Sequence, residues 1–119
     1  MVSSGTVSQA REAAKRILTD TATAFSFPTT RTGSSNTPSP RNEGQRQCRK
    51  STTLYQPVKD VVAAMEVIGV PWQVKLEYDA AIQKGWDLHF DDGLILHVEA
   101  VLNKRTDQLF TVAVCTERQ

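Results

Sequence analysis

Two histidines and several carboxylates lie close together in the last third of the chain, where they could support acid–base or metal chemistry. His89 and His97 flank the turn Asp91–Gly93, and Asp87 and Glu99 lie beside them. Imidazole and carboxylate groups bind metals and exchange protons. Two histidines on a solvated strand face give the same pattern, and no cysteine is placed to complete a ligand set. We therefore predict no catalytic residue, no metal site and no cofactor, and we expect a protein that is not an enzyme.

Four basic residues in the first half form a second group that could do chemistry. They are Arg41, Arg46, Arg49 and Lys50. Their cations could contact the phosphates of a nucleic acid or of an anionic lipid, and such contacts are electrostatic and salt-sensitive rather than sequence-reading. The group indicates an alternative function, a small nucleic-acid-associated protein that binds phosphates through a basic arm.

The same half of the chain carries three candidate phosphorylation sites. Thr37 and Ser39 each precede a proline, and Ser51 follows a run of basic residues. A phosphate on any of them would add about −1.5 to −2 charges at neutral pH. The spacing suits proline-directed and basic-directed kinases, so we predict an arm that is regulated by phosphorylation.

The charges of the chain divide near residue 53. Residues 1–53 carry eight Lys/Arg and three Asp/Glu, whereas residues 54–119 carry six and ten, so the net charge of +1 hides two opposed halves. The run TTRTGSSNTPSP at 29–40 has too little apolar content to offset chain ordering. We predict a short helical segment at 1–20, a basic, flexible Ser/Thr/Pro-rich linker at 21–53 and an α+β interaction domain at 54–119.

Two helices are expected. The segment Ser8–Leu18 carries a narrow, alanine-rich apolar face. In the segment 57–68 the apolar residues recur with helical spacing, at Val58, Val61, Val62, Met65 and Ile68. Pro57 suits the first turn of this helix, and Gly69 suits its end. The second helix is the stronger of the two predictions, because its apolar stripe is larger.

Alternating apolar and polar residues predict strands over 72–78, 86–90, 94–102 and 109–115. The dipeptide Asp92-Gly93 favours a tight hairpin turn between two of them. Such strands form an antiparallel meander with one face to bury. The predicted fold class is α+β with two layers: one main helix on a three- or four-stranded meander, preceded by a short N-terminal helix and a disordered linker.

The two cysteines and the hydropathy bear on location. Cys48 and Cys115 fit neither a metal motif nor a small disulfide scaffold, which favours free thiols in a reducing compartment. No window approaches the roughly 18 apolar residues of a membrane span, and the N-terminus has no secretory pattern. We expect a cytoplasmic or nuclear protein without a membrane span.

Residues 57–115 resemble the kinase-associated 1 (KA1) type of regulatory domain found in AMP-activated kinase α subunits. The resembling stretches are PVKDVVAAMEVIGVPWQV, GWDLHF and LILHVEAVLNKRTDQLFTVAV. The resemblance implies an α+β module that binds other parts of a kinase, a partner subunit or acidic phospholipid. The chain carries no recognisable kinase catalytic segment, and its second half is acidic where some KA1 domains are basic.

These observations favour a non-enzymatic regulatory or protein-interaction domain that docks to a protein partner or associates with itself as a dimer. Docking would use the last strand as an open edge, at Leu109, Phe110, Thr111 and Val112. The nucleic-acid hypothesis is the alternative. A third hypothesis places a small-molecule or enzymatic pocket between helix and sheet, with His89 and His97 in it.

Overall fold

A closed sheet forms the body of the molecule. The computed structural model describes residues 4–32, 35–65, 69–102 and 109–117. For residues 4–8, 29–32 and 35–38 it describes the backbone alone. The elements are α1 (Ser4–Ala14), the 3₁₀ turn η1 (Lys15–Ile17), β1 (Asp20–Ser26), β2 (Thr29–Thr32), β3 (Ser35–Pro38), β4 (Arg41–Ser51), α2 (Gln56–Met65), β5 (Pro71–Glu77), β6 (Asp87–Phe90), β7 (Ile95–Val101) and β8 (Phe110–Glu117).

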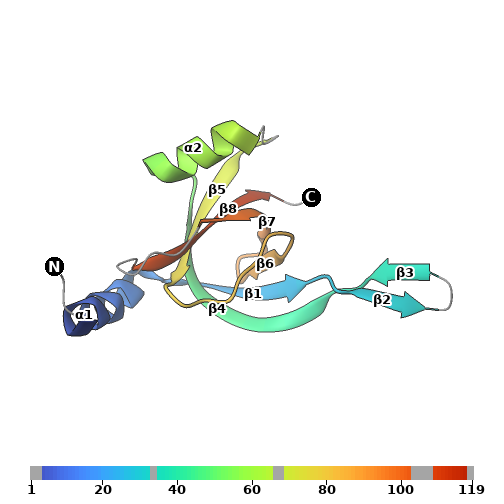
Figure 1. The fold of residues 1–119 in the computed structure, drawn as a ribbon, viewed down its shortest axis with the longest axis horizontal. Coiled ribbons are helices and arrows are strands. Elements are labelled where there is room, and N and C mark those ends of the chain that lie inside the picture. The colour runs from blue at the N-terminus through green and yellow to red at the C-terminus, as the bar shows by residue number, and fades with distance from the viewer. Residues whose placement is uncertain (1–3, 33–34, 66–68, 103–108, 118–119) are drawn as a thin grey trace.

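Six of the strands close into an antiparallel barrel in the order β1-β4-β5-β8-β7-β6, with β6 pairing back onto β1 (Figure 1). The predicted two-layer fold, a helix on a three- or four-stranded meander, is therefore wrong. The four expected strands do form, as β5 to β8. The prediction missed β1 and β4, which join the two ends of that set and turn an open sheet into a closed one.

The predicted disordered linker is also wrong, because β1 and β4 lie in the segment assigned to it. β1 places Ala22 and Ala24 in the interior, where both are fully buried, and its polar residues alternate with them. β4 places Cys48 in the interior, and most of its other residues are polar and at least partly exposed. Small or single inward residues leave little hydrophobic signal, so both strands resemble linker in composition.

The interior of the barrel is filled by side chains of unequal size from facing strands. Ala22 pairs with Phe90, and Ala24 pairs with Leu88, so small residues of β1 lie opposite large ones of β6. Alternation of small and large residues lets side chains fit the tapering interior of a small barrel. The buried core cluster comprises Ala22, Ala24, Cys48, Val74, Leu76, Ile82, Leu88, Phe90, Leu96, Val98, Ala113 and Cys115.

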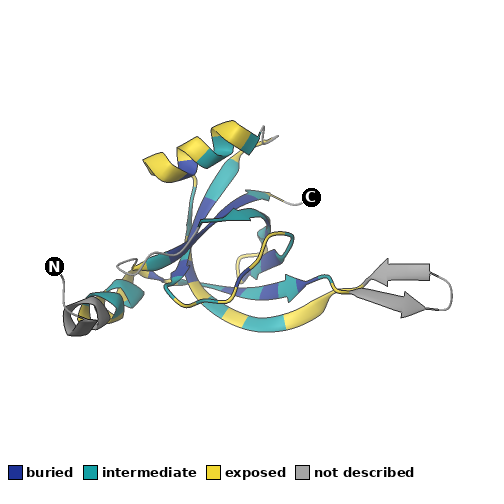
Figure 2. Ribbon diagram, in the orientation of Figure 1, coloured by how far each residue is buried: buried dark blue, intermediate teal, exposed yellow. Residues whose placement is uncertain are grey.

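Helix α2 covers the outside of the barrel. Its apolar stripe, with Val58 fully buried, packs on Val112 and Val114 of β8. The backbone N–H of Tyr55, just before the helix, donates to the side-chain oxygen of Gln73 on β5 at 3.0 Å. The helix thus does cover a sheet, as its spacing predicts, but it covers the outer face, and Figure 2 shows its other side exposed.

A two-stranded hairpin, β2–β3, extends beyond the barrel along the longest axis of the molecule, whose extent is 55 Å (Figure 1). It continues the ladder of β1 and β4: Ser26 pairs with Arg41, and the N–H of Ser39 donates to the oxygen of Pro28 at 3.2 Å. The hairpin is therefore an extension of two barrel strands.

A bulge lies near the point where this ladder leaves the barrel. The β1–β4 register shifts between Ala24 and Phe25, and Gly44 opposite has φ +96°. A positive φ favours glycine, and bulges bend and twist a strand locally. The side-chain oxygen of Asn42 accepts the Gly44 N–H at 2.7 Å and fixes this bend.

Helix α1 packs at the end of β5. The Arg11 guanidinium lies 3.7 Å from the centre of the Tyr78 ring, and Lys15 Nζ lies 3.9 Å from a Glu77 carboxylate oxygen. Leu18, at the entry to β1, is buried. Among the described residues, no helix has both the length and the apolar character needed to cross a membrane.

Candidate functional site

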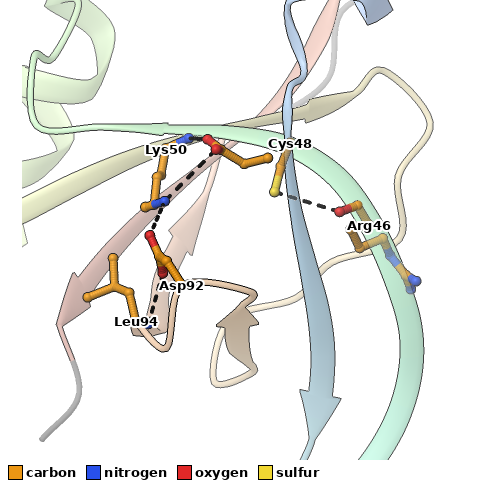
Figure 3. Close-up of polar contacts among 6 residues, drawn as sticks. Arg46, Cys48, Lys50, Asp92 and Leu94 are labelled. Carbon is orange, nitrogen blue, oxygen red and sulfur yellow. Dashed lines mark hydrogen bonds and ion pairs between the residues drawn. The ribbon is translucent and has the colours of Figure 1, made fainter.

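Lys50 lies at one end of the barrel interior, held by the chain's own acids (Figure 3). Its Nζ is 2.8 Å from an Asp92 oxygen, 3.9 Å from Asp20 and 4.8 Å from the centre of the Phe90 ring. The hydrogen bond to Asp92 raises the pKa of Lys50, and the same bond lowers the pKa of Asp92. Because two carboxylates already compensate the charge of Lys50, this cation would attract an incoming phosphate only weakly.

The acids in this cluster are themselves positioned by the backbone. Asp20 accepts the backbone N–H of Lys50 at 3.0 Å, and Asp92 accepts the N–H of Leu94 at 3.0 Å. The residues enclose a pocket of about 180 Å³, lined by Thr19, Asp20, Thr21, Lys50, Phe90, Asp91 and Asp92. The cluster joins β4 to the turn after β6, so its first role is to hold the end of the barrel together.

The other predicted phosphate contacts do not meet Lys50 in one patch. Arg46 bonds to backbone oxygens, at 3.1 Å to Ala81 and 2.9 Å to Glu43, and so ties β4 to the loop before β6. Arg41 is exposed, and its Nε lies 3.7 Å from a Glu43 oxygen. Arg49 is exposed, and it faces Lys75 across β4 and β5. Alternation along β4 puts Arg49 and Lys50 on opposite faces of the sheet.

The two histidines have different partners. His97 Nδ1 lies 2.7 Å from Asp87 Oδ1, and the two residues are direct partners across β6 and β7. His89 packs its ring against Phe25, with centroids 4.5 Å apart. Within the described ranges, no three His, Cys, Asp or Glu residues are grouped to hold a metal.

The hydroxyl next to the histidine–aspartate pair is engaged by a glutamate. Thr116 is the partner of His97 on β8, and its hydroxyl donates to Glu99 at 2.7 Å. Both cysteines are free and buried. Burial raises the pKa of Cys48 to about 12 and also raises the pKa of Cys115, which keeps both thiols protonated and unreactive at neutral pH.

The proposed docking edge is not an edge. β8 pairs with β5 along Phe110–Thr116 and with β7 along 113–117, and the Val112 oxygen accepts the N–H of Leu102, so β8 is an inner strand of the closed sheet. Thr111 is fully buried, and its hydroxyl donates to the Tyr78 oxygen at 2.8 Å. Leu109, just before the strand, is exposed. A strand cannot be added to β8, because a closed barrel leaves no free edge.

The candidate phosphorylation sites lie on or next to the hairpin and the end of β4. Thr37 belongs to β3, and Ser39 follows β3 as an exposed residue. Ser51 ends β4, is half-buried, and accepts the N–H of Thr53 at 3.0 Å. The two proline-directed sites are thus placed on the projecting part of the molecule, whereas Ser51 is part of a local turn.

A pocket at the root of the hairpin went undetected in the sequence. It measures about 400 Å³ and is lined by Ser26, Phe27, Pro28, Glu43, Gln83, Lys84, Gly85 and Trp86. The hydroxyl of Ser26 donates to Glu43 at 2.7 Å across its floor. Trp86 and Phe27 were the available signal, but they come from segments far apart in sequence and meet only because the barrel closes.

The fold is similar to the solution structure of protein SF1141 from Shigella flexneri 2a, a structural genomics target. The TM-score is 0.63 at 12% identity, over 82% of this chain and 90% of that chain. A likeness at this identity shows the fold alone. No protein-family model matches the chain, and no curated protein matches it.

Proposed function

We propose that this chain is a non-enzymatic protein-interaction module that binds a protein partner, or a second copy of itself, through the outer edges of the β2–β3 hairpin. One observation carries the proposal: the two strands pair with each other beyond the barrel, and among the described residues no further strand pairs with either. Unpaired strand edges offer backbone N–H and C=O groups to a partner strand. A two-stranded hairpin alone is marginally stable in water, so a partner would also order it.

The polar clusters support a role without catalysis. His97 is oriented by Asp87, the hydroxyl of its β8 partner Thr116 donates to Glu99, and the raised pKa values of Cys48 and Cys115 make both poor nucleophiles. Lys50 is neutralised by Asp20 and Asp92. These groups all stabilise the barrel, which leaves the hairpin as the element that the barrel presents.

The alternative, binding of nucleic-acid phosphates through the basic arm, has less support. Arg46 and Lys50 are engaged within the barrel, so the arm offers fewer exposed cations than its composition suggests. Phosphorylation at Thr37 or Ser39 would place negative charge on the binding element itself and so regulate it. Free buried thiols suit a reducing cytoplasm or nucleus. The KA1 resemblance remains a prediction.

The test removes the hairpin and keeps the barrel. In the variant, a tight Asn-Gly turn replaces residues 29–38 and joins Pro28 to Ser39, whose backbones are already hydrogen-bonded. Partner capture from cell extract and sedimentation mass at several concentrations are compared with the full chain, and thermal melting verifies that the barrel still folds. We expect loss of the captured partner or of the larger mass. A folded variant with the same mass and the same partners at unchanged affinity would refute the proposal.

A further inference from the structure

Two cations occupy paired positions on the outer face of neighbouring barrel strands. Arg49 on β4 and Lys75 on β5 are direct cross-strand partners. Arg49 is exposed, and Lys75 is half-buried with its Nζ 5.2 Å from the centre of the Phe110 ring. In the part of the chain that the structure describes, no carboxylate forms an ion pair with either.

This pairing is unfavourable for the barrel by itself. Like charges directly opposite on neighbouring strands are destabilising, whereas opposite charges at the same positions stabilise. The other cations of β4 are compensated: Lys50 by two carboxylates, Arg41 by Glu43 and Arg46 by backbone oxygens. A carboxylate of a ligand would therefore be favoured beside this pair.

The pair lies on a strip of sheet bordered by the two helices. On β5, Gln73 is held by the start of α2, and Glu77 on the same face is approached by Lys15 after α1. Lys75 lies between these two positions. Figure 1 shows α1 and α2 on the same side of the barrel, with β5 and β8 running between them. The cation pair therefore lies between the β5 residues that contact the segments around the two helices.

We propose that this strip, Arg49 and Lys75 between α1 and α2, binds an acidic segment of a partner protein. The inference rests on the proposed interaction function and adds a second contact with stated chemistry. Carboxylates accept charge-assisted hydrogen bonds from Arg and Lys. A nucleic acid fits less well, because tracking a phosphate backbone takes several cations in a row and this strip offers two adjacent ones.

The test uses a fluorescent polyglutamate peptide as the probe, with anisotropy as the readout at low and high salt. Lys75→Glu is the decisive variant, because it replaces the repulsion by an opposite-charge pair with Arg49 and so leaves the barrel at least as stable. We expect this variant to lower the affinity for the peptide by about tenfold or more, since it removes one attraction and adds a repulsion. Its denaturation midpoint stays equal or rises.

Controls separate the strip from general charge effects. Lys84→Glu makes the same charge change in the exposed loop before β6, and we expect it to alter peptide affinity by less than about twofold. A polylysine peptide and a single-stranded polynucleotide test the sign and the class of ligand. The proposal is overturned if the full chain does not bind polyglutamate, or if Lys84→Glu lowers the affinity for the peptide as much as Lys75→Glu does. It is also overturned if the polynucleotide binds more tightly than the peptide through the same residues. The chain without the hairpin is expected to retain polyglutamate binding, so this test and that of the hairpin fail independently.

Discussion

The pairing of Ala24 on β1 with Leu88 on β6 offers a direct test of barrel closure. Both side chains are fully buried, and the two residues are cross-strand partners. Leu88→Ala leaves a cavity and should lower the free energy of unfolding by about 3 kcal/mol. Ala24→Leu forces extra methyl groups into a packed interior and should cost about 2 kcal/mol. Unfolding in urea, followed by tryptophan fluorescence, measures both.

The double variant is the informative one. If the two changes were independent, their costs would add to about 5 kcal/mol of unfolding free energy. In the double variant, however, the leucine only moves to the other side of the same contact. We therefore expect the double variant to lose about 3 kcal/mol, which corresponds to a coupling energy of about 2 kcal/mol. Thr23→Leu, on the outer side of the same strand, is the control and should change stability by no more than about 0.5 kcal/mol. If Ala24→Leu changed stability as little as Thr23→Leu and showed no coupling to Leu88→Ala, β1 would not line the interior and the barrel would not close as described.

Two further predictions concern ionisable groups. Lys50 lowers the pKa of Asp92 from its ordinary value of 3.8, so the contribution of Asp92 to stability is present above that pH and is lost as pH falls through the lower folded value. The difference in unfolding free energy between the wild type and Asp92→Asn should therefore shrink in acid, and a difference that persists or grows there would contradict the ion pair. Cys48 and Cys115 should resist a thiol reagent at neutral pH in the folded protein and react fully in denaturant, because burial raises the pKa of both. Rapid labelling of the folded chain would show that one of them is exposed.

The sequence predicted the elements whose apolar residues are large and regularly spaced. The stripe that includes Val58 and Val61 identified α2, and the alternation around Leu88 and Leu96 identified strands of the sheet. β1 was not predicted as a strand because its inward residues are alanines, which carry little hydrophobic signal in a strand. The mistake was one of residue size, since these alanines are buried as completely as any leucine in the barrel.

The candidate site was harder to predict, because it depends on register. Alternation along β4 shows from sequence alone that Arg49 and Lys50 point to opposite faces. That Lys75 lies opposite Arg49, and that Asp20 and Asp92 meet Lys50, follows from the pairing of strands far apart in the chain. Charge content alone therefore placed four basic residues in one predicted group, whereas the fold separates them.

Closure through β1 also has a consequence for the order in which the protein is made. The ribosome releases β1 and β4 early, and these two can pair with each other at once across the hairpin. Ala22, however, must wait for Phe90, and β8 arrives last of all to fill the place between β5 and β7. Until then the nascent chain presents open strand edges, which are the sites of aggregation in slow, non-local β folds. We expect the barrel to form only after β8 has emerged, rather than in two steps divided at residue 53.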